Sequence, residues 1–154
     1  MLIAAGKWKI QVDVEDTARA YSQLSPTVGV TPVERNLYEY RSLAYSDQLH
    51  TFLGQLGVRP DCEVDIAYFG SNIPGCPNSL EHFYQGWFDA AGTVVAAPEA
   101  EDMNAWLVDG KVGLSFEQHR DRSPYFEPGR PLIRIYFSIC LPWRVQGATP
   151  IPAS

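Results

Sequence analysis

The chain has 154 residues, of which 45% are hydrophobic and 19% charged, a balance typical of one globular domain rather than of a disordered chain. The formal net charge of −6, with lysine only at positions 7, 9 and 111, argues against nucleic-acid binding. No stretch approaches the roughly 20 apolar residues that span a bilayer, and the short apolar start is interrupted by Lys7, so neither membrane insertion nor a signal sequence is expected. The default expectation is a cytoplasmic protein.

The first half of the chain predicts one strand followed by helices. Residues 8–12 alternate apolar and polar side chains, as a half-buried strand does. Asp13 is placed to cap a short helix, and Thr31-Pro32-Val33-Glu34 has the spacing of a capping box at the start of a second. A third helix, or a kinked continuation, is predicted after Ser46 and ends at Gly57.

The second half predicts strands. Residues 80–88 and 132–141 alternate most clearly, and Asp109-Gly110 is a strong hairpin turn. A further turn is predicted at Ala91-Gly92, and residues 70–79 read as a loop. The shorter predicted strands are residues 62–69, 93–95, 106–108 and 112–116.

Helices segregated from a run of strands indicate an α+β fold. We expect a mostly antiparallel sheet of about five or six strands with two or three helices packed on one face. The other face should carry polar and aromatic side chains such as Tyr136 and Ser138. Residues 1–145 are expected to form the single domain, with a frayed tail over residues 146–154.

No recognised catalytic motif is present, and we assign no catalytic residue, metal ligand or cofactor from the sequence. The chain lacks a G-x-S-x-G elbow, a phosphate-binding P-loop and a dinucleotide-binding glycine motif. Isolated histidines do not make a metal site, which needs several converging ligands. An odd number of cysteines without a C-x-x-C pair does not indicate a disulfide framework, so structural roles are expected for Cys62, Cys76 and Cys140.

Aromatic residues are abundant in the predicted strands, and they supply most of the candidate ligand-binding residues. Strand alternation divides them between the two sheet faces, so part of the set is available to line a pocket. Acidic side chains nearby would suit an apolar or cationic ligand. Aromatic cross-strand pairs that only stabilise the sheet explain the same pattern equally well. The candidate ligand-binding residues are Tyr68, Tyr84, Trp87, Trp106, Tyr136, Glu63 and Asp65.

Three segments resemble an uncharacterised family of small bacterial proteins: Trp8-x-Ile10-x-Val12-Asp13, Tyr84-x-Gly86-Trp87-Phe88 and Leu141-Pro142-Trp143. Many members of that family have a small cysteine cluster that residues 28–33 of this chain lack. The resemblance supports the domain boundary and implies no activity. Small stand-alone domains of this type also occur as products of mobile gene cassettes.

The sequence therefore favours a non-catalytic binding module for a small apolar or cationic molecule. The alternative is a protein-interaction domain, in particular a homodimer formed through the strand at residues 132–141. A third hypothesis is an enzyme that uses His82 or His119 with a nearby carboxylate.

Overall fold

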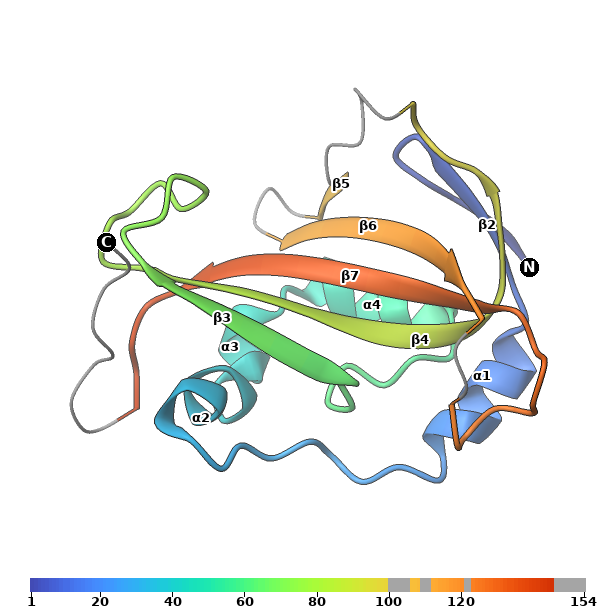
Figure 1. The fold of residues 1–154 in the computed structure, drawn as a ribbon, viewed down its shortest axis with the longest axis horizontal. Helices are drawn as coiled ribbons and strands as arrows, with labels where there is room; N and C mark the ends of the chain where they lie inside the picture. Colours follow the sequence, from blue (N-terminus) through green and yellow to red (C-terminus); the bar gives the residue numbers. More distant parts are fainter. Residues whose placement is uncertain (100–105, 109–111, 121–122, 146–154) are drawn as a thin grey trace.

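A computed structural model describes residues 1–99, 106–108, 112–120 and 123–145. Within them, seven strands form one antiparallel sheet in the order β1-β2-β4-β7-β6-β5, and β3 pairs with β4 outside that path (Figure 1). The strands are β1 (Leu2–Ala5), β2 (Trp8–Val12), β3 (Asp65–Ser71), β4 (His82–Ala96), β5 (Trp106–Val108), β6 (Val112–His119) and β7 (Leu132–Leu141).

Four helices occupy the chain between β2 and β3, and three of them begin at predicted caps. They are α1 (Val14–Tyr21), α2 (Pro32–Tyr38), α3 (Arg41–Ala44) and α4 (Asp47–Gln55). The side chains of Asp13, Thr31 and Ser46 each accept a hydrogen bond from the backbone N–H three residues later. These caps satisfy N–H groups that would otherwise lack partners in the first turn of each helix.

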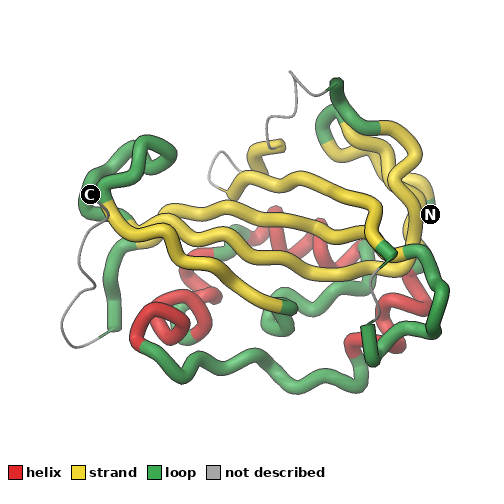
Figure 2. Tube along the Cα trace, in the orientation of Figure 1, coloured by secondary structure: helices red, strands yellow, loops and turns green. Residues whose placement is uncertain are grey.

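The helices cover one face of the sheet and leave the other open, as the sequence predicted. Figures 1 and 2 show α4 behind the sheet, with α1 and α2 along its lower edge. Strand β7 alternates along its length, with Ile133, Ile135, Phe137 and Ile139 buried among the core residues and Arg134, Tyr136 and Ser138 only partly buried. The α+β class is confirmed, with more strands and helices than expected.

Strand β4 is continuous where a turn was predicted at Ala91-Gly92. It pairs with β7 along residues 82–91, while its other edge changes partner from β3 to β2. Gly92 lies at this change, opposite Val12, and a Cβ there would lie 2.1 Å from the Gln11 carbonyl oxygen. The glycine therefore permits the close approach of β2 instead of a chain reversal.

The edge of β4 between these two partners is completed by helix α1. The Tyr21 hydroxyl donates to the Asp89 carbonyl oxygen at 2.8 Å and accepts from the Asp89 N–H at 3.2 Å. The Thr17 hydroxyl accepts from the Ala91 N–H at 3.0 Å. Side chains of one helix thus take the place of a strand over a short length of the edge, and β2 and β3 stay apart.

A disulfide joins Cys76, in the loop before β4, to Cys140 in β7, although the sequence did not indicate a disulfide framework. The two residues are separated by 64 positions along the chain, so spacing within one segment gave no sign of the pair. Cys62 is buried with a free thiol.

The core cluster of the described residues draws on strands β1, β2, β4, β5, β6 and β7 and on helices α1, α2 and α4. The predicted tail at residues 146–154 and the predicted turn at Asp109-Gly110 lie outside the described residues, although β5 and β6 on either side of that turn pair with each other. None of the described helices is long and apolar enough to cross a membrane.

Candidate functional site

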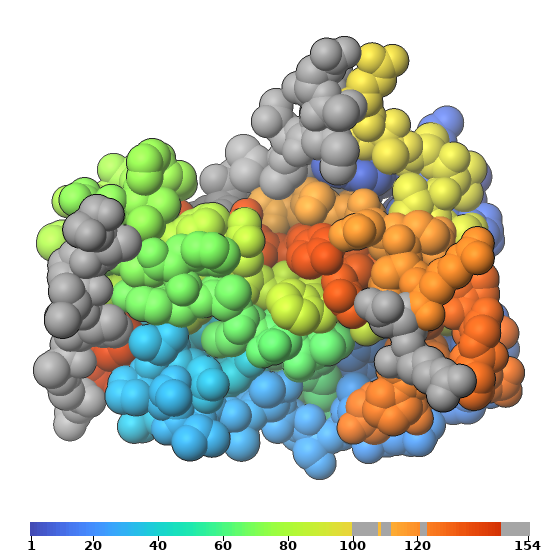
Figure 3. Space-filling model, in the orientation of Figure 1, coloured from blue at the N-terminus to red at the C-terminus, as the bar shows by residue number. Residues whose placement is uncertain are grey.

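A cleft of about 580 Å³ opens beside the part of β4 that α1 completes. Part of its lining comes from the end of α1 and the chain that follows it, and another part comes from residues 123–126, between β6 and β7. These two segments, coloured blue and orange, lie along the lower part of the surface in Figure 3. The lining comprises Ala20, Tyr21, Gln23, Leu24, Ser25, Thr27, Cys62, Glu63, Val64, Asp89, Ser123, Pro124, Tyr125, Phe126 and Arg134.

The main charged group of the cleft is Asp89, a buried aspartate on β4. Its Oδ1 atom lies 3.0 Å from His119 Nε2 and 3.4 Å from Arg134 Nε. The Arg134 guanidinium also stands 5.2 Å from the centre of the Trp87 ring. A buried carboxylate needs such partners because desolvation of an unpaired charge costs several kcal/mol. The network fixes Asp89 against the cleft.

Glu63 borders the cleft and belongs to a second buried ion pair. Its Oε2 atom accepts hydrogen bonds from Arg41 Nε at 3.1 Å and Nη2 at 3.0 Å. Burial raises the pKa of Glu63, and the nearby Arg41 charge opposes that rise. Because Arg41 compensates Glu63 and Arg134 compensates Asp89, the cleft carries less negative charge than its carboxylates alone suggest.

The cleft contains a cysteine that is poorly suited to nucleophilic chemistry. Burial, together with a hydrogen bond to Asp61, raises the pKa of Cys62 to about 11. A thiol with this pKa is almost entirely protonated at neutral pH, and the thiolate is the reactive form. Burial also raises the pKa of Tyr21, so its hydroxyl keeps the proton that it donates to Asp89.

Two predicted site residues, Tyr68 and Tyr84, lie on the helix-covered side of the sheet. Their rings are 5.2 Å apart, and Tyr84 is fully buried with its hydroxyl donating to the Val33 carbonyl oxygen. The Tyr68 hydroxyl lies 2.7 Å from His82 Nδ1. These residues join the core to α2 and do not line the cleft.

Three other predicted residues, Trp87, Tyr136 and Asp65, lie on the open face. Tyr136 and Asp65 are the register partners of Trp87 on β7 and β3, and the rings of Trp87 and Tyr136 are 6.1 Å apart. The backbone of Trp106 belongs to β5, while its side chain lies outside the described part of the structure. The predicted residues are therefore divided among three places, and only Glu63 borders the cleft.

Tyr21, Asp89, Phe126 and Arg134 line the cleft and were not predicted as site residues. One sequence signal for Asp89 existed, because an acidic residue between the aromatic and alanine residues of a strand is expected to be paired or functional. Phe126 carried no comparable signal, since it lies in an irregular loop.

Neither histidine of the enzyme hypothesis lines this cleft. His119 contacts Asp89 from β6, which partly fits the expected histidine–carboxylate pair. His82 contacts Tyr68 instead, and burial lowers its pKa. These contacts stabilise charged and polar groups at the sheet surface and in the core.

Comparison of the chain with protein-family models, with curated proteins and with solved structures found no match.

Proposed function

We propose that the protein is a non-catalytic binding module that takes a small molecule with an apolar body and a single amine in the cleft beside Asp89. The observation that carries the proposal is the cleft itself. Its volume of about 580 Å³ lies within the range of small-molecule sites, which are concave and mostly apolar with a few fixed polar groups.

The walls of the cleft suit an apolar body. Tyr125 is 45% exposed although it is a large aromatic residue, and Phe126 beside it is buried. Leu24 and Val64 add aliphatic surface to the lining. Burying an aromatic ring against such surface is favourable by about 25 cal/mol for each Å² removed from water.

The Asp89 carboxylate is the natural partner for an amine. Both of its neighbours, His119 and Arg134, approach the same oxygen, Oδ1. An ammonium group is a compact donor that could join this network, whereas a ligand carboxylate would be repelled by Asp89. Arg134 limits the preference, so we expect selectivity for a cation of about tenfold rather than absolute discrimination.

Binding can be tested with three ligands of the same ring and chain length: an arylalkylamine, an arylalkanol and an arylalkanoate. At a concentration of 100 times its Kd, a ligand stabilises the fold by about 2.7 kcal/mol, which raises Tm by roughly 5–10 °C. We expect this shift with the amine and smaller shifts with the alcohol and the carboxylate.

Matched variants locate the binding. Ser25→Trp fills the cleft and should abolish the shift, while Val28→Trp places the same side chain at a position of the same segment that is 78% exposed and outside the lining. Asp89→Asn should remove the preference for the amine over the alcohol. The proposal fails if no ligand raises Tm, or if binding survives Ser25→Trp unchanged.

Self-association through the open sheet face is the second candidate function. Phe69 at its rim is 46% exposed and its ring lies 5.6 Å from that of Phe83. Exposed aromatic pairs of this kind are common in interfaces. Light scattering at micromolar concentration tests this candidate, and a monomer in both wild type and Phe69→Asp would remove it.

A further inference from the structure

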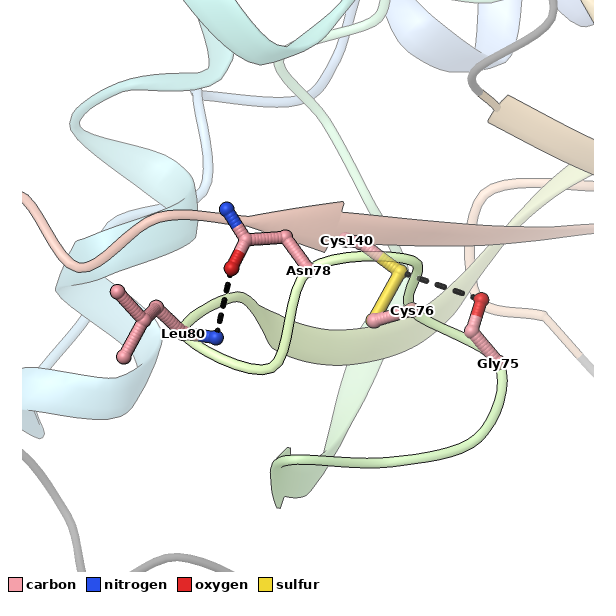
Figure 4. The surroundings of a disulfide bond; sticks show 5 residues. All are labelled: Gly75, Cys76, Asn78, Leu80 and Cys140. Atoms are coloured by element: carbon pink, nitrogen blue, oxygen red, sulfur yellow. Dashed lines mark hydrogen bonds between the residues drawn. A yellow bond between two sulfur atoms is a disulfide. The ribbon is translucent and has the colours of Figure 1, made fainter.

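The loop between β3 and β4 brings together three side chains that can bind a metal ion. Cys76 and Cys140 are joined there, and Figure 4 shows the bond between loop and strand. The Glu81 carboxylate lies close by, so that one ligand atom from each of the three residues is within 4.8 Å of the others. The cluster is separate from the cleft, because Cys140 pairs with Phe83 while Arg134 pairs with Asp89 further along β4.

We propose that this cluster is a redox-gated zinc site, closed as a disulfide under oxidising conditions and able to bind Zn²⁺ when the disulfide is reduced. Reduction by a dithiol transfers two electrons and two protons to the cystine, giving two thiols and the oxidised reductant. Binding of Zn²⁺ then releases both thiol protons to solvent. The two thiolates and the Glu81 carboxylate occupy three of the four positions around a tetrahedral Zn²⁺, and water takes the fourth.

The distances fit this exchange. In a tetrahedral site with Zn–S bonds of about 2.3 Å, the ligand atoms lie about 3.8 Å from one another. The Glu81 oxygen, already within 4.8 Å of the sulfurs, needs to move by only about 1 Å. The two sulfurs must separate from about 2.0 Å to about 3.8 Å once their bond opens. The loop carries Gly75 and Pro77 and has no regular structure that would resist such a shift.

Backbone hydrogen bonds hold Cys76 and Glu81 in two local turns of the loop. The Cys76 N–H donates to the Ile73 carbonyl oxygen at 2.9 Å, and the Glu81 N–H donates to the Asn78 carbonyl oxygen at 3.0 Å. The second turn is reinforced by the Asn78 side chain, which accepts from the Leu80 N–H at 2.9 Å (Figure 4). None of these contacts involves the sulfur–sulfur bond, so we expect the three groups to stay near one another in the reduced chain.

The cluster is reachable from solvent. Cys140 and Glu81 are partly exposed, so both a reductant and a metal ion have access. In a reducing cytoplasm, the setting that the sequence predicts, a disulfide would be opened. Zinc would then replace it as the link between the loop and β7.

The test uses Co²⁺ as a spectroscopic substitute for Zn²⁺. Wild-type protein reduced with a phosphine should bind one Co²⁺ with thiolate-to-metal charge-transfer absorption, and one equivalent of Zn²⁺ should displace it. Oxidised protein should show no such band. The Cys140→Ser variant should lose the band, and Glu81→Gln should weaken binding at least about tenfold.

Two controls make the result decisive. Cys62→Ser removes the thiol outside the cluster and Glu15→Gln removes an exposed carboxylate, and both should bind Co²⁺ as wild type does. If the reduced chain loses its circular dichroism signal, Zn²⁺ must restore that signal in wild type and not in Cys140→Ser. Absence of the band or of this recovery in reduced wild type, or its persistence in Cys140→Ser, overturns the proposal.

Discussion

The hydroxyl of Tyr21 is the single atom on which the edge of β4 depends most, and Tyr21→Phe removes it. The hydroxyl satisfies both the N–H and the carbonyl oxygen of Asp89, and Tyr21 is 2% exposed. The substitution keeps the ring and changes no charge, so the loss of these two hydrogen bonds is the main effect.

The loss in the free energy of unfolding comes from the Asp89 N–H and carbonyl oxygen, which Tyr21→Phe leaves without a hydrogen-bond partner. A buried donor or acceptor without a partner costs about 1–3 kcal/mol, which gives a range of about 2–6 kcal/mol for the pair. The neighbouring cleft can admit water to one of them, so we expect about 3 kcal/mol. For a domain of this size, Tm should fall by roughly 6–12 °C.

Urea unfolding and calorimetry measure the change directly. Tyr125→Phe is the control, because Tyr125 is 45% exposed and its substitution should change stability by less than about 0.5 kcal/mol. A loss below about 1 kcal/mol for Tyr21→Phe would show that α1 does not complete the sheet edge as argued.

Three further predictions concern buried polar groups. Arg41→Ala should destabilise the fold by about 3–5 kcal/mol, because it leaves the buried Glu63 carboxylate without its cationic partner. Adding Glu63→Gln should restore part of that loss in a double-mutant cycle. Asn36→Leu should cost about 3 kcal/mol in urea unfolding, because the Asn36 side chain bonds three backbone groups after β7. Burial raises the pKa of six tyrosines, and the rise is largest for Tyr21, Tyr38, Tyr45 and Tyr84. Tyrosines of the unfolded chain therefore ionise first, and the stability of the fold should fall by several kcal/mol as pH rises from about 10 to about 11. Tyrosinate absorbance should show delayed ionisation of Tyr21, Tyr38, Tyr45 and Tyr84 until the chain unfolds.

Local chemistry predicted the elements well because it acts over a few residues. The caps at Asp13, Thr31 and Ser46 depend on a side chain and an N–H three positions later. The alternation of β7 is a property of ten consecutive residues. The turn predicted at Ala91-Gly92 was wrong. Gly92 is needed there because β2, about eighty positions earlier in the chain, packs too close to leave room for a Cβ.

The candidate site could not be assembled from the sequence for the same reason. Asp89 and Arg134 meet only because β4 pairs with β7, and Tyr21 reaches Asp89 only because β2 and β3 leave a gap on the same edge. Cys76 and Cys140 likewise meet through strand pairing, since Phe83 near the loop is the partner of Cys140. Periodicity assigns a residue to a sheet face but does not tell which strand lies beside it.

The position of the cleft follows from how the sheet is built. A strand that continued from β2 to β3 would satisfy the edge of β4 with its backbone and would cover the region beside Asp89. Here Tyr21 and Thr17 supply the hydrogen bonds instead, and side chains satisfy backbone groups while filling less of the edge than a strand does. The space that remains exposes the Asp89 network to the segment that carries Tyr125 and Phe126. The side chains of α1 that occupy the place of a strand therefore both stabilise the edge of β4 and leave the concave surface beside it. Tyr21→Phe should consequently change ligand binding in the cleft and the stability of this edge together.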